Sequence, residues 1–213
     1  RIIKNIHILL KDEDISYLIV NDLFDGVESD IKIQVNLNNK KDLLIYSYQV
    51  AGTVGLMMAK ILKVKDHQSL RGAVDLGIAM QLTNIARDVI EDKKKNRAYI
   101  KADFNSISET IFLADIFYQN SFSAIRNIPT FSRFAILVAR RIYKRIGYEI
   151  LAQKNIENYN NAGKIYVSVF FKIVETLLSI FDFIKLFFIK SSNQEKHNEH
   201  TMLHKEINLN ERI

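Results

Sequence analysis

The chain contains no cysteine and no tryptophan, one proline and seven glycines in 213 residues. Without cysteine it can form no disulfide bond and carry out no thiolate chemistry, which fits a reducing compartment. So little proline and glycine is unusual for an all-β or loop-rich protein, because turns depend on both residues. Hydrophobic residues make up 48% of the chain and recur at helical spacing, so the sequence predicts an all-α fold with a sizeable core.

No signal-peptide pattern and no nucleic-acid-binding module is recognisable in the sequence. The chain begins at Arg1, already inside an apolar helical pattern, so we expect a fragment or a processed product. A net charge of +6 is compatible with nucleic acid, an anionic membrane surface or an anionic substrate as partner. The basic cluster at residues 93–95 is not interleaved with aromatic residues, which argues against nucleic acid.

The hydrophobic pattern predicts one helical domain at residues 1–190 and a polar C-terminal tail at residues 191–213. We expect the end of the tail to be frayed or disordered, and its histidines, His197, His200 and His204, to be solvated.

The segment at residues 165–190 is apolar and rich in phenylalanine, but four charged residues interrupt it. A core helix with one wet face is the first interpretation. A helix lying on a bilayer and a membrane-spanning helix are the second and third.

Small residues share one face of the helix predicted at residues 41–62. Ala51, Gly55 and Ala59 fall at positions i, i+4 and i+8. A glycine inside a helix costs about 1 kcal/mol relative to alanine, so another group must approach this face closely. Tight helix–helix packing and the wall of a channel for a long apolar ligand explain the pattern equally well.

A polar stripe runs along the next long helix, predicted at residues 69–92. Asn84, Asp88 and Asp92 fall at i, i+4 and i+8, which brings neighbouring Cβ atoms to roughly 5–6 Å. Amide and carboxylate oxygens suit Mg²⁺, which completes its shell with waters and phosphate oxygens. Arg87 beside the stripe has a planar guanidinium that suits a diphosphate. On the spacing of the two aspartates alone, an ordinary solvated helix end is the more common explanation.

Two longer signatures contain these residues. One is YSYQVAGTVGLMM at residues 46–58, and the other is DLGIAMQLTNIARDVIED at residues 75–92, followed by RAY at residues 97–99. Weaker similarities lie at residues 24–30 and 139–147. In these motifs and in their spacing the chain resembles the squalene/phytoene synthase family, and its bacterial phytoene synthase branch most closely.

The resemblance implies a single helical bundle of the isoprenoid synthase type around a central apolar cavity. It implies a prenyltransferase that joins two prenyl diphosphates head to head through a cyclopropyl diphosphate. In the phytoene branch, two geranylgeranyl diphosphates give phytoene for carotenoid biosynthesis. A squalene or C30 dehydrosqualene synthase is one alternative, and a non-catalytic assembly or lipid-binding protein on the same scaffold is another.

The resemblance also implies a cofactor, a location and partners. The cofactor is Mg²⁺, which Mn²⁺ can replace, and the substrate is a prenyl diphosphate. The expected location is cytoplasmic, peripheral to the inner face of the membrane, because the product is a very apolar hydrocarbon. No nucleic-acid partner is expected.

Site residues follow from the same resemblance, position by position. Asn84, Asp88 and Asp92 match metal ligands, and both aspartates count as catalytic. Tyr46 and Tyr143 match tyrosines that face the reacting centre. Substrate contacts are matched by Gln81, Arg87, Val50, Ala51, Gly52, Gly55 and Lys164. With this resemblance the small-residue face is interpreted as a channel wall.

The chain departs from the family pattern at one important point. The family's first aspartate-rich motif should lie well upstream of residues 24–30, and it is not found here. We therefore expect this chain alone to be inactive, with the motif supplied by residues before Arg1 or by a second chain, unless the protein is a non-catalytic relative. In addition, Asn96 and Lys101 replace a usual Gly and Pro, and Lys164 replaces a common Arg, which loses bidentate geometry.

Overall fold

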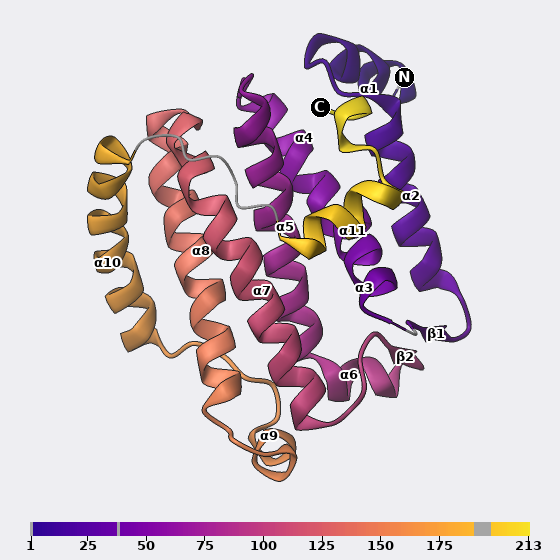
Figure 1. Ribbon diagram of the computed structural model, residues 1–213, viewed down its shortest axis with the longest axis vertical. Coiled ribbons are helices and arrows are strands. Elements are labelled where there is room, and N and C mark those ends of the chain that lie inside the picture. Colours follow the sequence, from indigo (N-terminus) through magenta and orange to yellow (C-terminus); the bar gives the residue numbers. More distant parts are fainter. Residues whose placement is uncertain (1, 38, 190–196) are drawn as a thin grey trace.

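The computed structural model describes residues 2–37, 39–189 and 197–213, and its regular structure is almost entirely helical (Figure 1), as predicted. The α-helices in chain order are α1 (Ile2–Asp12), α2 (Tyr17–Ile31), α3 (Lys40–Ser47), α4 (Thr53–Ile61), α5 (His67–Arg87), α6 (Val89–Lys94), α7 (Phe104–Ala124), α8 (Thr130–Leu151), α9 (Ile156–Ala162), α10 (Val169–Phe188) and α11 (Asn198–Glu206). Strands β1 (Val35–Asn36) and β2 (Arg97–Ala98) pair in parallel.

Helix starts follow local side-chain chemistry. Asp66 accepts a hydrogen bond from the Ser69 N–H at the start of α5, and Asp103 caps α7 in the same way. Pro129 directly precedes α8, where its missing N–H breaks no helical hydrogen bond. At the start of α2, Ser16 accepts a hydrogen bond from the Leu18 N–H, and Asp14 before it adopts a left-handed conformation with φ of 53°.

Helix α5 is the centre of the bundle. It packs against α4, α7 and α8, and α10 packs on α8 at the edge of the molecule (Figure 1). Val74, Ile78 and Leu82 of α5 are completely buried. Burying each such side chain stabilises the fold by about 1.5–3 kcal/mol, so α5 contributes strongly to the core.

Two glycines allow the small-residue face to touch α5 at the backbone. A Cβ atom on Gly55 would lie 2.3 Å from the carbonyl oxygen of Ala73, and one on Gly77 would lie 2.2 Å from that of Ala51. Both distances are far below van der Waals contact with a backbone atom that cannot move aside. Tight helix packing is therefore one reason for the small residues.

Two predicted long helices are less regular than expected. The helix predicted at residues 41–62 contains a π-helical turn, η1 (Tyr48–Gly52), between α3 and α4. The helix predicted at residues 69–92 ends at Arg87, because Asp88 has non-helical dihedrals (φ −104°, ψ 15°). Hydrogen bonds from the Asp88 N–H to the Asn84 carbonyl and from the Asp92 N–H to the Asp88 carbonyl carry the chain through this bend.

The C-terminal end also differs from the prediction. Helix α11 and a short 3₁₀ helix, η3 (Leu209–Glu211), pack on the main core through the buried side chains of Leu203, Ile207 and Leu209. The expectation of a frayed end is wrong for residues 197–213, because these apolar side chains reach the core. Residues 190–196 lie outside the described residues.

Helix α10 accounts for most of the segment at residues 165–190. No helix in the described ranges combines the length and the apolarity that a membrane crossing requires, so the membrane-spanning interpretation is excluded for α10.

Candidate functional site

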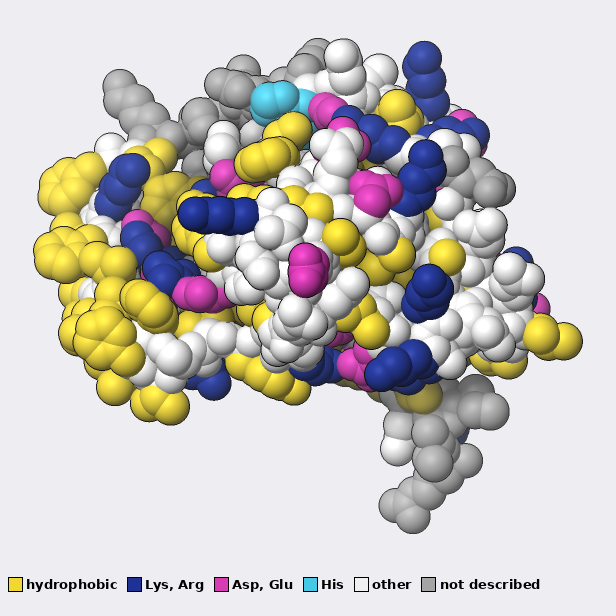
Figure 2. Space-filling view, turned by 90° about the horizontal axis from the view of Figure 1, so that it is seen from below, with side chains coloured by type: hydrophobic (Ala, Val, Ile, Leu, Met, Phe, Trp, Pro, Cys, Tyr) yellow, Lys and Arg dark blue, Asp and Glu magenta, His cyan; other side chains and the backbone are white. Residues whose placement is uncertain are grey.

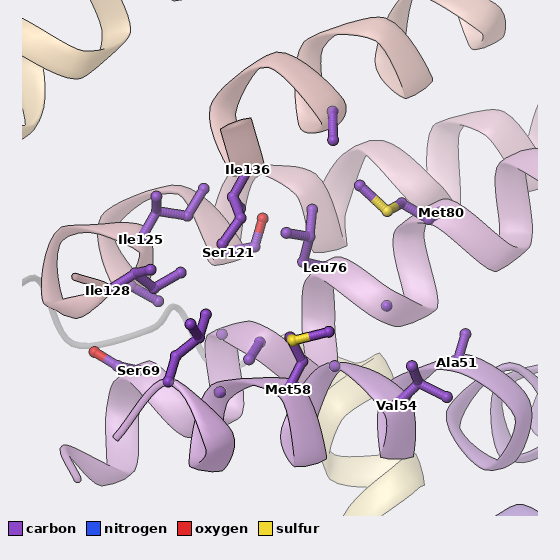
Figure 3. Close-up of a pocket in the computed structure, with 18 of the residues that line it drawn as sticks. Ala51, Val54, Met58, Ser69, Leu76, Met80, Ser121, Ile125, Ile128 and Ile136 are labelled. Carbon is purple, nitrogen blue, oxygen red and sulfur yellow. The ribbon is translucent and has the colours of Figure 1, made fainter. Parts of the chain in front are cut away.

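An apolar cavity of about 340 Å³ lies between α4, α5, α7 and α8. Figure 3 shows Met58 of α4 and Leu76 of α5 directed into the same space from facing helices. The small-residue face takes part in this wall as well as in packing, since Ala51, Gly55 and Ala59 all line it. Of the predicted substrate contacts, the residues that line the cavity are Val50, Ala51, Gly55 and Gln81.

The predicted contact Gly52 lies outside the cavity. A Cβ atom at this position would meet Tyr48 and Val74 at 3.0 and 3.1 Å, so Gly52 serves the packing of η1 on α5.

The polar stripe begins where the cavity ends. Asn84 and Gln81 line one end of the cavity, whereas Ser69 and Ile128 line it near the start of α5. The side-chain oxygen of Asn84 is buried and has no hydrogen-bond partner among the described residues. An unpaired buried oxygen is costly unless a donor or a cation arrives, so Asn84 is a candidate ligand position.

Asp88 lies among cations. The Arg87 guanidinium donates two hydrogen bonds to the Asp88 carboxylate, at 2.8 and 2.7 Å, and these bonds raise the pKa of Arg87. Lys164, from the connection between α9 and α10, has its Nζ 3.5 Å from Asp88 and 2.8 Å from Glu91. The fold thus brings the three predicted residues Arg87, Asp88 and Lys164 together, although Lys164 follows Asp88 by 76 positions in the sequence.

Asp92 is the last residue of the polar stripe, and its surroundings disfavour the charged form of its carboxyl group. Burial, followed by the charge of Asp88, raises its pKa to about 6. Two carboxylates one helical turn apart repel each other, and a bound cation would relieve that repulsion. Asp92 also borders a small crevice that Arg97 and Tyr99 help to form.

Tyr159 supports the bend at Asp88 and was not identified from the sequence. Its buried hydroxyl oxygen lies within donating distance of the carbonyl oxygens of Ala86 (2.9 Å) and Arg87 (2.7 Å), the last two residues of α5. These carbonyls would otherwise lack donors where the helix stops. Only a lone tyrosine in an asparagine-rich segment marks the position, and that is no usable signal.

Tyr46 belongs to a buried cluster outside the cavity. Its hydroxyl lies 3.0 Å from both carboxylate oxygens of Asp30, and its ring stacks on Tyr99 at 4.8 Å. The Tyr99 hydroxyl donates to Asp30 at 2.7 Å, and Arg97 donates to the Asp30 carbonyl at 3.0 Å. Burial, followed by contact with Tyr99, raises the pKa of Tyr46. Three separate sequence motifs therefore meet at one point.

Tyr143, the other predicted tyrosine, is half-buried between the two hydrophobic clusters of the core. It lies near Arg87 and is one of the smaller causes of the raised pKa of that residue. Of the two tyrosines, Tyr143 is thus the one associated with the cationic side of the polar stripe.

The oxygens of Asn84, Asp88 and Asp92 fit Mg²⁺ in chemical type, and the unpaired Asn84 oxygen supports that fit. Within the described ranges, no cluster of three or more His, Cys, Asp or Glu side chains could hold a metal ion. A magnesium ion here would depend on water and diphosphate oxygens for much of its shell, which is its usual coordination in proteins.

The fold and this site define a helical bundle of the isoprenoid synthase type. The family model described as "Squalene/phytoene synthase" matches residues 1–106, and 15-cis-phytoene synthase from Paracoccus sp. is 35% identical over 147 residues. The chain belongs to the squalene/phytoene synthase family.

Other relatives agree with this assignment. The chloroplastic phytoene synthase of an Oncidium hybrid cultivar is 32% identical over 175 residues, which cover 69% of this chain and 41% of the orchid protein. A crystal structure of a dehydrosqualene synthase in complex with ligand superposes with a TM-score of 0.62 at 25% identity, covering 81% of this chain and 66% of that one.

The alignment with the Paracoccus enzyme covers 61% of this chain and 48% of that enzyme. The chain therefore spans about half the length of the curated relatives it matches.

Proposed function

We propose that the protein acts in the head-to-head condensation of two prenyl diphosphates, with two geranylgeranyl diphosphates giving phytoene through a cyclopropyl diphosphate in carotenoid biosynthesis. One observation carries the proposal: the unpaired oxygen of Asn84 lies at the end of an apolar cavity, where the carboxylate stripe begins. A prenyl diphosphate has the same two parts, a long apolar chain and a compact anion.

The residues of the stripe match the charge that the reaction develops. When diphosphate leaves, negative charge grows on its oxygens, and Arg87 and Lys164 are cations beside the stripe that can stabilise it. Asn84, Asp88 and Asp92 would hold Mg²⁺, which when bound supplies further charge stabilisation. The apolar cavity excludes water from the carbocation that remains, and the face of Tyr143 can favour a nearby cation.

The length of the cavity favours a C20 substrate. Its lining extends along α5 from Ser69 to Asn84, a rise of about 22 Å at 1.5 Å per residue. An extended isoprene unit adds four carbon–carbon bonds of about 1.5 Å each, or about 5 Å along the chain after zigzag projection. Four units therefore span about 20 Å, close to the length of this lining.

Two other functions are the alternatives. A C30 product is supported by the similarity to a dehydrosqualene synthase structure. A non-catalytic assembly or lipid-binding role would fit a chain in which one carboxylate stripe stands alone. Catalysis would require a second aspartate-rich motif, from further residues of the protein or from a second chain. Because the substrate tail and the product are apolar, we also propose peripheral contact with the inner face of the membrane.

The test is incubation of the purified protein, as this chain and as its complete reading frame, with Mg²⁺ and either geranylgeranyl or farnesyl diphosphate. Phytoene from the C20 substrate is the expected product of the complete protein. Squalene or dehydrosqualene from the C15 substrate would support the first alternative. Binding of diphosphate without any hydrocarbon product, from either form of the protein, would contradict the enzymatic proposal.

A further inference from the structure

Helix α10 presents a broad apolar surface away from the bundle. Six of its side chains fall in one stripe at helical spacing and are each at least 49% exposed. We call these the α10 apolar face: Phe170, Ile173, Leu177, Phe181, Ile184 and Phe188. Figure 2 shows hydrophobic side chains gathered at the left edge of the molecule, over α10. Exposed apolar patches of this kind mark an interaction surface.

The acidic and the basic residues of α10 lie in different surroundings. Its two acidic residues, Glu175 and Asp182, turn toward α8 and both pair with Arg141, at 3.0 and 2.6 Å. Its two lysines, Lys172 and Lys185, are exposed. The exposed charges of α10 are therefore positive only, in a chain whose net charge is +6. That combination is complementary to a surface of anionic lipid.

The shape of the face favours a lipid surface over a second copy of the chain. A stripe that pairs two helices is narrow, whereas the exposed apolar arc of α10 is widened by Leu178 on one side and by Ile180 and Phe187 on the other.

We propose that the α10 apolar face lies in the interfacial layer of an anionic membrane, with Lys172 and Lys185 at the level of the lipid headgroups. The inference rests on the peripheral membrane contact proposed above. It is independent of the chemistry at Asn84 and Asp88, because α10 packs on the side of the bundle outside α8 (Figure 1). Vesicle binding without substrate therefore tests it separately from catalysis.

The absence of tryptophan allows a position-specific test on the 213-residue chain. Leu177→Trp places a single reporter in the α10 apolar face. Phe112→Trp is the matched control, because Phe112 is 61% exposed on α7. With phosphatidylcholine vesicles containing phosphatidylglycerol, we expect the emission of Leu177→Trp to shift to shorter wavelength and that of Phe112→Trp to stay unchanged. An equal shift at both positions, or no shift at either, would overturn the proposal.

Substitutions then separate the apolar and electrostatic parts of binding. Replacing Phe170 and Phe181 by serine should weaken vesicle binding at least about ten-fold, whereas Phe112→Ser should not. Lys172→Gln and Lys185→Gln should each weaken binding to anionic vesicles about five-fold and leave neutral vesicles unaffected. Unaltered binding by the double serine variant contradicts the proposal. The proposal is also contradicted if the unsubstituted chain sediments as a dimer and the double serine variant as a monomer. In that case a second copy of the chain would occupy the face.

Discussion

Helix α5 and the residues that directly follow it carry two aspartate-centred clusters that differ in the partners of their carboxylates. Asp75 is buried, and its carboxylate lies 3.0 Å from Nε2 of His200 on α11. Burial raises the pKa of Asp75 against the opposing hydrogen bond from His200. Burial alone would lower the pKa of His200, but the hydrogen bond and the charge of Asp75 outweigh it and leave that pKa raised.

The second cluster lies at the C-terminal end of α5 and in the residues that follow it. Asn84 keeps an unpaired oxygen, and Asp92 has a pKa raised to about 6 because burial and Asp88 disfavour its charge. The Asp75 carboxylate thus has an imidazole partner, although Nδ1 of that imidazole is itself unpaired within the described ranges, whereas Asp88 and Asp92 repel each other beside the unpaired Asn84 oxygen. Two repelling carboxylates beside an unpaired oxygen favour a bound cation, so we propose that the C-terminal end of α5 is its functional end.

The largest effect is expected at Asp88. Asp88→Ala should weaken Mg²⁺-dependent binding of a geranylgeranyl thiodiphosphate at least about a hundred-fold, because loss of an outer-shell partner alone costs 10–100-fold in metal sites. Isothermal titration calorimetry measures the affinity. Glu91→Ala is the matched control, since it also removes a carboxylate that pairs with Lys164, and it should change binding little. Equal losses in both variants would remove the special role of the stripe.

At the contact between Asp75 and His200 we expect a loss of stability rather than of ligand binding. His200→Ala should lower the free energy of unfolding by about 3 kcal/mol near pH 6, because it leaves the buried Asp75 without its imidazole partner. Urea denaturation measures the loss, and ligand binding should persist. Since the folded pKa of His200 is raised, its contribution is fully present below the ordinary pKa of about 6.5 and is lost as pH rises through the folded value. If the loss of stability in His200→Ala grew with pH, the ion pair between His200 and Asp75 would be contradicted.

A smaller effect is expected from pH at the stripe. A metal ligand must be deprotonated, so Mg²⁺-dependent binding should hold above pH 6 and fall about ten-fold per unit below it, as Asp92 becomes protonated. Calorimetric titrations between about pH 7.5 and about pH 5 test this, because that range spans the pKa of Asp92. In the variant Asp92→Asn, the pH dependence of binding should be weaker. If the pH profile were unchanged, a group other than Asp92 would be responsible for it.

Lys164 should give the smallest effect. Its ion pairs with Asp88 and Glu91 lie at the surface, where such pairs contribute little. Lys164→Ala is expected to weaken thiodiphosphate binding about three-fold, and Lys164→Arg to preserve or improve it through bidentate contact. Lys101→Ala, which removes an exposed lysine elsewhere, is the control for a general effect of charge. A larger loss in the control would mean that only net charge matters.

The sequence predicted features whose cause is local. Helical periodicity predicted the positions of the main helices, and the spacing of Asn84, Asp88 and Asp92 predicted one polar stripe, which the bend at Asp88 preserves through its hydrogen bonds. Arg87 and Lys164, predicted separately as substrate contacts, both lie beside Asp88.

Features that depend on distant contacts could not be predicted. The bend at Asp88 is held by Tyr159, and the cluster of Asp30, Tyr46 and Tyr99 joins three separate segments. Helix α11 was missed because its sequence is polar and only a few apolar residues, such as Leu203, attach it to the core. Periodicity within one segment carries no information about such partners.

The central claim is that the polar stripe of Asn84, Asp88 and Asp92, which begins on α5, binds a divalent cation at the mouth of the apolar cavity. Crystals grown with Mn²⁺ and a geranylgeranyl thiodiphosphate test it directly, because Mn²⁺ gives an anomalous diffraction signal. We predict an anomalous peak about 2.2 Å from the side-chain oxygens of Asn84 and Asp88, with the prenyl chain extending toward Ser69. A peak elsewhere, or an Asn84 oxygen that accepts a hydrogen bond from the protein while the ligand lies outside the cavity, would contradict the account.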